Sequence, residues 1–232
     1  MSGRDPHLVV FTGAGLSAES GLPTFRGGDG LWEGRHIDQV CNQLTWKRNV
    51  DAVHRFYNDR RAAAAKAQPN RAHRLLASWQ DRYRCTLITQ NVDDLLERAG
   101  AGDVMHVHGR LDRMRCEACG TAWEIGASSW GPYTGRCPKC ASRRGVRPDV
   151  IFFHERAPRY LDMWRVVNSP RTEVRGFRLI SRLTPAPFPA RSLLAAESLT
   201  FPFPASYMAP CLVQRAQRAA PAVPAGDGVR GR

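Results

Sequence analysis

Short apolar runs alternate along the chain with longer segments in which apolar residues recur every three or four positions. The runs predict three buried strands, at residues 8–11, 85–89 and 104–107. The periodic segments predict three helices, at residues 51–67, 71–81 and 92–99. Pro69 and Gly100 follow the first and the last of these helices, and both are residues that end helices. Because strands and helices alternate, we predict an α/β fold with a doubly wound, Rossmann-like parallel sheet.

The segment from residue 116 to 145 interrupts this alternation with glycines and paired cysteines, which predicts an inserted small module. The strand pattern returns at residues 150–153 (VIFF). We therefore divide the chain into four parts: a Rossmann-like part with a helical insertion (1–115), a zinc-binding module (116–145), a return to the Rossmann-like part (146–174) and a tail rich in proline, alanine and arginine (175–232).

Four cysteines form two C-x-x-C pairs with 17 residues between them: Cys116, Cys119, Cys137 and Cys140. This spacing is typical of a four-cysteine zinc ribbon, in which each pair presents two thiolates to one ion. Four thiolates leave no position for a substrate water, so we predict a structural zinc ion. Free buried thiols are the alternative, although they rarely occur as two such pairs.

Composition and charge exclude several classes of protein. With 232 residues, 43% of them hydrophobic, the chain can bury a core, which excludes wholesale disorder. No apolar run approaches the roughly 20 residues of a membrane helix, and residues 1–7 lack the apolar stretch of an export signal. We therefore expect a cytoplasmic protein with no membrane partner. The net charge is +13, but the sequence contains no block of five or more basic residues. This distribution of charge favours a solvated basic surface over a specific nucleic-acid site.

A glycine-rich motif directly follows the first predicted strand. Residues 13–18 (GAGLSA) match the G-x-G-x-x-G/A fingerprint, whose glycines let the backbone approach a pyrophosphate. Taken alone, the match leaves an ordinary glycine turn as the alternative. The acidic residue that usually binds a ribose is not evident near position 35, and no strand is predicted there.

The residues around this motif resemble the sirtuin family of NAD-dependent protein-lysine deacylases. Residues 13–32 read GAGLSAESGLPTFRGGDGLW, residues 90–93 read QNVD and residues 106–109 read HVHG. These motifs occur in the family's order and spacing, and the resemblance covers about residues 8–174. It implies that the chain transfers an acyl group from a protein lysine to NAD, giving nicotinamide and O-acyl-ADP-ribose. Acylated protein lysines are then the expected partners, and the sequence predicts no oligomeric state.

The resemblance implies a set of NAD-binding residues. Amide and carboxylate groups at residues 90–93 follow a predicted strand, where open α/β sheets bind ligands, although Asn91 or Asp93 could instead cap a helix. The implied set is Gly13, Ala14, Gly15, Ser17, Ala18, Glu19, Thr24, Phe25, Arg26, Trp32, Gln90, Asn91, Val92 and Asp93.

The resemblance also implies a catalytic base, His108. Imidazole titrates near neutral pH, and the reaction must remove a proton from a ribose hydroxyl. Side chains alternate between the two faces of a strand, so His106 and His108, two positions apart, would lie on the same face. This alternation does not identify which of the two is the base. The family's His-Gly pair selects His108, which Gly109 follows.

Tyr57 and Arg60 lie three residues apart on a predicted helix and should project from one face. In the sirtuin subgroup that removes succinyl and malonyl groups, a tyrosine and an arginine at this spacing bind the acyl carboxylate, so the resemblance implies that substrate role. The alternative is an amphipathic helix with Tyr57 in the core and Arg60 in water.

The sequence departs from the family's pattern at two places. His154 stands where the family has the glycine of a Phe-Gly-Glu segment. After Val174 we find neither the strand ending in Gly-Thr-Ser nor the later strand end with asparagine, which hold the adenosine half of NAD in the family. Residues 175–232 contain eight of the 16 prolines and no lysine. We expect this tail to be disordered or the product of a frame-shifted gene, so that the C-terminal part of the sheet is missing.

Three other functions compete with this interpretation. A zinc-stapled partial fold without an adenosine site would be an inactive sirtuin remnant, which a measurement of NAD binding distinguishes. A basic zinc ribbon that binds nucleic acid would leave residues 13–32 unexplained. A hydride-transferring dehydrogenase is weaker still, because the chain has no signature of a substrate domain.

Overall fold

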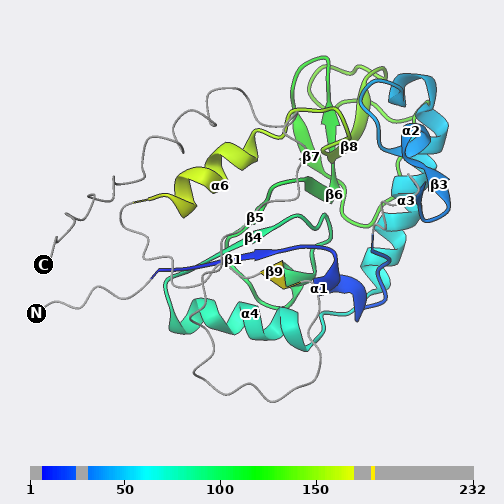
Figure 1. Ribbon diagram of the computed structural model, residues 1–232. Helices are drawn as coiled ribbons and strands as arrows, with labels where there is room; N and C mark the ends of the chain where they lie inside the picture. The colour runs from blue at the N-terminus through cyan, green and yellow to red at the C-terminus, as the bar shows by residue number, and fades with distance from the viewer. Residues whose placement is uncertain (1–6, 25–30, 170–178, 181–232) are drawn as a thin grey trace, which may run out of the picture. The chain divides into compact units, whose positions relative to one another are not determined.

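A parallel sheet forms the centre of the computed structural model, which describes residues 7–24, 31–169 and 179–180 (Figure 1). The strands lie in the order β5-β4-β1-β9. Their bounds are Leu8–Thr12 for β1, Cys85–Thr89 for β4, Val104–His106 for β5 and Leu179–Ile180 for β9. The three strands predicted from apolar runs are confirmed. The last strand lies within the predicted tail and pairs with β1 at Phe11 and Thr12.

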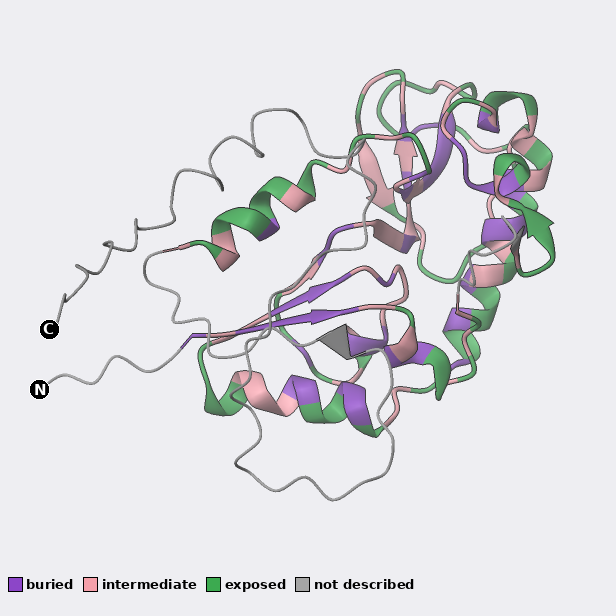
Figure 2. Ribbon diagram, in the orientation of Figure 1, coloured by how far each residue is buried: buried purple, intermediate pink, exposed green. Residues whose placement is uncertain are grey.

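Helices cover both faces of this sheet, as the alternating pattern predicts. In Figure 1, α4 (Arg71–Arg82) and α6 (Arg159–Val167) lie on opposite sides of the strands. Leu76 of α4 packs with Val10, whereas Met163 of α6 packs with Val9 and Phe11. Neighbouring residues of β1 therefore bury their side chains on opposite faces, which is the period of a strand. Figure 2 shows buried residues along β1 and β4, the strands enclosed by these helices.

The other helices agree with the predicted segments to different degrees. The predicted helix at 51–67 is α3 (Val50–Lys66), and the one at 71–81 is α4. The segment 92–99 contains only a short helix, α5 (Leu95–Arg98). Just before this helix the Asp93 side chain accepts a hydrogen bond from the backbone N–H of Leu95 (3.2 Å), whereas the N-cap residue, Asp94, makes no side-chain capping bond. A further short helix, α1 (Gly15–Ala18), follows β1.

The chain between the glycine-rich motif and α4 forms a helical layer. A two-stranded hairpin, β2 (Leu31–Trp32) and β3 (Arg35–His36), leads into α2 (Ile37–Val40), a 3-10 turn (Trp46–Arg48) and α3. The aromatic side chains of this layer pack together in one core: Trp46, Phe56, Tyr57 and Phe152 are each at most 2% exposed.

A second sheet is antiparallel and holds the cysteine pairs. Its order is β7-β6-β8, with β6 at Gly109–Cys116, β7 at Ala122–Glu124 and β8 at Val146–Val150. This sheet therefore includes residues on both sides of the predicted module 116–145. Gly109 lies opposite Val150 and has a φ of 81°. A Cβ at this position would clash with the carbonyl oxygen of Asp149, at 2.0 Å.

The predicted strand at 150–153 is wrong. The strand ends at Val150 and pairs with β6, outside the parallel sheet. Beyond Val150 the regular ladder gives way to a single bridge, in which the N–H of Phe153 donates to the carbonyl of Cys41 (2.9 Å). Side chains bond the neighbouring groups: the buried Arg147 donates to the carbonyl of Val150 (2.7 Å), and Glu155 accepts from the N–H of Phe152 (3.0 Å). Phe152 is buried in the helical layer, so the apolar run fills that core. A run of four apolar residues does not reveal which core it enters.

Within the ranges described, the structure contains no helix of the length and apolar character that a membrane span requires.

Candidate functional site

The carboxyl ends of three parallel strands meet at one edge of the sheet. The register places Thr12 of β1 beside Thr89 of β4, and Thr89 beside His106 of β5. The hydroxyl of Thr12 donates to that of Thr89 (2.8 Å), and both threonines are buried. The segments that follow these strands carry the GAG, QNVD and HVHG motifs, so the structure brings the three motifs together. Open α/β sheets bind their ligands at such an edge.

A buried polar network links the first two motifs. Ser17, 2% exposed, donates to Asp93 Oδ2 (2.9 Å) and accepts a hydrogen bond from Asn91 Nδ2 (2.9 Å). Burial raises the pKa of Asp93 above its ordinary value, although the hydrogen bond from Ser17 acts in the opposite direction. The N-cap of α5 is Asp94, which makes no side-chain capping bond, so neither Asn91 nor Asp93 is the cap residue. Asp93 Oδ1 accepts from the backbone N–H of Leu95, and its Oδ2 accepts from Ser17.

Gly13 lies where two of the motifs approach one another closely. A Cβ at this position would lie 3.3 Å from the side-chain oxygen of Gln90, which is tighter than ordinary van der Waals contact. The backbone N–H of Gln90 donates to the carbonyl of Thr12 (2.9 Å), and this bond holds the loops at that distance. A larger residue at position 13 would have to displace the Gln90 amide.

The remaining predicted NAD residues differ in their exposure. Ala14, Ala18 and Glu19 are exposed, whereas Gly15, Thr24, Trp32 and Val92 are partly buried. Phe25 and Arg26 lie outside the described residues, as does the predicted tail except for β9.

The structure separates the two candidate histidines. β5 ends at His106, so the strand does not run straight through both. His106 is buried, with Nδ1 2.8 Å from the carbonyl oxygen of Asn91 and Nε2 2.7 Å from a carboxylate oxygen of Glu97. Both of its ring nitrogens are therefore engaged within the fold, which favours a structural role.

His108 lies in the turn after β5 and belongs to a closed ring of hydrogen bonds. Its Nδ1 lies 3.2 Å from the carbonyl oxygen of Gln90, its Nε2 lies 2.9 Å from the hydroxyl of Tyr160, and that hydroxyl accepts from the Gln90 amide (3.1 Å). A carbonyl oxygen can only accept a hydrogen bond, so Nδ1 carries the proton. Nε2 is therefore unprotonated and accepts from the Tyr160 hydroxyl. Burial lowers the pKa of His108, which favours this neutral form.

Sequence reasoning missed Tyr160. It lies on α6, 52 residues from His108, and nothing in its spacing marks it. Only the packing of α6 over the sheet brings the two rings together, with centroids 5.7 Å apart.

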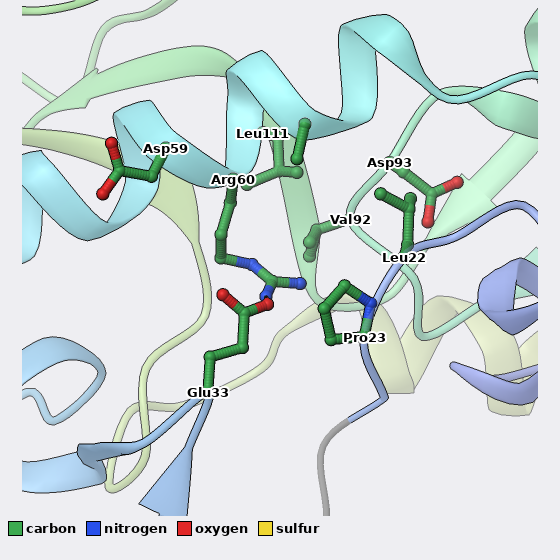
Figure 3. Close-up of a pocket in the computed structure, with 9 residues that line it drawn as sticks. Leu22, Pro23, Glu33, Asp59, Arg60, Val92, Asp93 and Leu111 are labelled. Carbon is green, nitrogen blue, oxygen red and sulfur yellow. Dashed lines mark hydrogen bonds and ion pairs between the residues drawn. The ribbon is translucent and has the colours of Figure 1, made fainter.

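A cavity of about 260 Å³ opens beside α3 (Figure 3). Its lining is Leu22, Pro23, Glu33, Asp59, Arg60, Ala63, Val92, Asp93 and Leu111. Among the described residues of this lining Arg60 is the one that is basic, and its Nη1 forms an ion pair with the carboxylate of Glu33. Figure 3 shows the two side chains pointing toward one another.

Tyr57 does not share this position with Arg60. Its side chain is completely buried, and its hydroxyl donates to the sulfur of Cys41 (3.2 Å). Its ring stacks on Phe152, with centroids 5.8 Å apart. The structure therefore places Arg60 in the cavity lining and Tyr57 in the core.

The four predicted zinc ligands converge on one point. Their sulfur atoms all lie within 4.8 Å of one another. The Sγ atoms of Cys116 and Cys140 are 3.7 Å apart, and those of Cys119 and Cys137 are 3.6 Å apart. Zinc–sulfur bonds of about 2.3 Å require tetrahedron edges of about 3.8 Å, and these two sulfur–sulfur distances match that value. Thiolate is also the ligand type that structural zinc sites use most.

The family model described as the Sir2 family matches residues 13–173. This range includes every motif at the sheet edge and all four cysteines. The chain belongs to the Sir2 family. Among its relatives is an NAD-dependent protein deacylase of Helicobacter hepaticus, which is 45% identical over 175 residues, 68% of this chain and 68% of the relative. NAD-dependent protein deacylase 1 of Archaeoglobus fulgidus is 42% identical over 154 residues, 66% of this chain and 62% of the relative.

Solved structures of Sir2 homologues share the fold. A Sir2 homologue in complex with NAD superposes with a TM-score of 0.60 at 41% identity, over 69% of this chain and 62% of that one. A variant Sir2 homologue in complex with ADP-ribose gives a TM-score of 0.62 at 40% identity, over 69% and 64% of the two chains. The Sir2-family chain thus spans about two thirds of the length of the relatives that it matches.

His154 occupies an unusual backbone conformation in this Sir2-family chain. Its φ of 64° lies in the left-handed region, which glycine adopts more easily than other residues. The glycine expected here from the sirtuin pattern would suit this conformation, so histidine at this position carries backbone strain.

Proposed function

We propose that this chain removes acyl groups from protein lysines in an NAD-dependent reaction, and that it prefers succinyl and malonyl groups to acetyl. The observation that carries the first part is the buried polar cluster at the sheet edge, in a chain of the Sir2 family. Relatives over most of its described length are named NAD-dependent protein deacylases. The second part rests on Arg60 in the cavity lining.

The residues present fit NAD. The amides of Gln90 and Asn91 offer both a donor and an acceptor, which suits a carboxamide, and Asp93 offers an acceptor for hydroxyl groups. Gly13 keeps the loop after β1 close to Gln90, because a side chain at position 13 would have to displace the Gln90 amide. When bound, NAD supplies the ribose carbon that the acyl oxygen attacks and the nicotinamide that leaves.

The protein contributes positioning and a base. His108 is held as the neutral imidazole, and its Nε2 lone pair is bonded to the Tyr160 hydroxyl. A ribose hydroxyl that replaced Tyr160 at Nε2 would lose its proton to a base that need not first lose one of its own. The Gln90 carbonyl fixes the ring orientation through Nδ1. Because burial lowers the pKa of His108, the base should stay neutral to a lower pH than an exposed histidine does, and the fall of activity on acidification should shift to lower pH in the same direction.

We further propose that the zinc module is structural and that the chain functions in the cytoplasm. A four-thiolate site needs reduced cysteines, and the cytoplasm maintains them. The four-part division of the chain, with residues 175–232 as its last part, belongs to this proposal.

Replacing Arg60 with methionine tests the proposed acyl preference. We expect the Michaelis constant for a succinyl-lysine peptide to rise about 10- to 100-fold more than that for an acetyl-lysine peptide. The reason is that a hydrogen bond to a charged group contributes roughly 1.5 to 3 kcal/mol, and acetyl has no carboxylate. Steady-state kinetics with both peptides measures this difference.

Arg55→Met is the matched control, because Arg55 is exposed on the same helix and does not line the cavity. It removes the same charge and should leave the ratio of the two Michaelis constants unchanged. Equal effects of Arg60→Met on both peptides would show that Arg60 has only a structural role.

A further inference from the structure

We propose that Glu33 is an internal competitor for the acyl pocket: its carboxylate occupies Arg60 while no acidic acyl group is bound, and it must leave when one binds. This inference rests on the proposed role of Arg60 in binding the acyl carboxylate. It makes Glu33 a residue that determines how strongly the pocket prefers succinyl-lysine or malonyl-lysine over acetyl-lysine.

The charges of the cavity lining show why Glu33 matters. In the part of the chain that the structure describes, the lining contains three acidic residues, Glu33, Asp59 and Asp93, and one basic residue, Arg60. An incoming carboxylate therefore meets an excess of negative charge unless one acid is withdrawn. Asp93 is held by hydrogen bonds from the Ser17 hydroxyl and from the backbone N–H of Leu95. Figure 3 shows Asp59 pointing away from Arg60, so Glu33 is the acid that directly competes for its charge.

The guanidinium of Arg60 is held in place by aromatic rings. Its central carbon lies 4.3 Å from the ring centroid of Trp32 and 5.5 Å from that of Phe56. Such cation–π contacts favour the guanidinium position whether or not a carboxylate is present. The side chain is only 11% exposed, which limits screening of its charge by solvent. Arg60 is thus a fixed partner for any carboxylate that reaches the cavity.

Glu33 is the movable member of the pair. It lies with Gly34 in the two-residue turn between β2 and β3, and its φ of 51° lies in the left-handed region. Such a turn favours asparagine or aspartate before glycine, so glutamate is strained there. Its side chain is 29% exposed, compared with 11% for Arg60. A strained, more exposed side chain can leave the pair at lower cost than a packed one.

Arg60 also retains an unused donor. Its Nε is buried and has no hydrogen-bond partner within the described part of the chain. An unsatisfied buried donor is costly, and a carboxylate that reached Nε would relieve this cost. Glu33, bonded at Nη1, does not relieve it. A substrate carboxylate therefore has an interaction to gain that the internal carboxylate leaves unmade.

Peptide binding by the full chain tests this inference directly. Dissociation constants for a succinyl-lysine and an acetyl-lysine peptide of the same sequence would be measured by calorimetry for the wild type and for Glu33→Gln. Glu33→Asn serves as a second variant. Asparagine suits the turn, carries no charge, and has a side chain too short to reach the Arg60 guanidinium. Glu124→Gln, in β7 and outside the cavity lining, controls for the loss of one negative charge.

We expect Glu33→Gln and Glu33→Asn each to tighten succinyl-lysine binding about three- to tenfold relative to acetyl-lysine binding, because the competing ion pair is gone. Glu124→Gln should leave this ratio unchanged. In an Arg60→Met background, Glu33→Gln should no longer change it, because no charge remains to compete for.

The outcomes separate this inference from the proposed function. If Arg60→Met weakens succinyl-lysine binding selectively but the Glu33 variants weaken it or leave it unchanged, Glu33 positions Arg60 or is a bystander, and only this inference fails. If Arg60→Met weakens binding of neither peptide, the acyl-binding role of Arg60 fails, and the inference fails with it.

Discussion

Replacing His108 with alanine is expected to lower kcat about 10²- to 10⁴-fold while NAD affinity changes little. A general base contributes a factor of this size to the rate and little to the binding of the ground state. The hydrogen bonds of His108 with Gln90 and Tyr160 make Nε2 the unprotonated, basic atom of the ring. The alanine variant lacks this atom, so the expected loss of rate is the loss of the base. Turnover and NAD binding, measured on the same preparation, separate the two effects.

His106→Ala is the matched control for this result. Both ring nitrogens of His106 are engaged by Asn91 and Glu97, so its loss should lower the unfolding temperature more than the rate per folded molecule. An active His108→Ala variant beside a folded but inactive His106→Ala variant would identify His106 as the base and contradict our assignment.

Replacing Cys137 with serine is expected to release the zinc ion and unfold the module. Cys137 is 2% exposed and packs with Met114 and Val146, so the metal site and the small core share a residue. Zinc binding to such sites releases about 10 kcal/mol or more, and this free energy is folding free energy because the unfolded chain has no preformed site. Elemental analysis and circular dichroism, before and after a chelator, measure both losses.

Cys85→Ala provides the control. Cys85 lies in β4, outside the tetrad, and burial raises the pKa of its thiol to about 11, so it remains protonated near neutral pH. This variant should retain one zinc per chain. A metal-replete wild type without zinc, or a Cys137→Ser variant that retains it, would show that the four cysteines are not its ligands.

The parallel sheet could be predicted from the sequence because its signals are local. β1 and β4 are short apolar runs, and such runs suit strands that are buried on both faces. The cysteine tetrad was predictable for a similar reason, since C-x-x-C spacing alone fixes which thiolates can share an ion.

The residues that the sequence did not reveal depend on contacts between distant segments. Tyr160 reaches His108 only because α6 packs over β5, and Glu33 reaches Arg60 only because a hairpin turns toward α3. Spacing placed Tyr57 and Arg60 on one helical face, but a face about 100° wide spans both core and cavity. The hydroxyl of Tyr57 is bonded to Cys41, which a helical period cannot show.

NAD binding to the zinc-loaded full chain, measured by titration calorimetry, tests the central claim that the strand ends of β1, β4 and β5 form an NAD site. We predict saturable binding to wild type that weakens at least tenfold in Asn91→Ala, because Asn91 anchors the network with Ser17. Asn168→Ala, which alters an exposed amide at the end of α6, should bind as wild type does. A folded, zinc-loaded wild type without saturable NAD binding would contradict the account and identify the chain as an inactive remnant of its family.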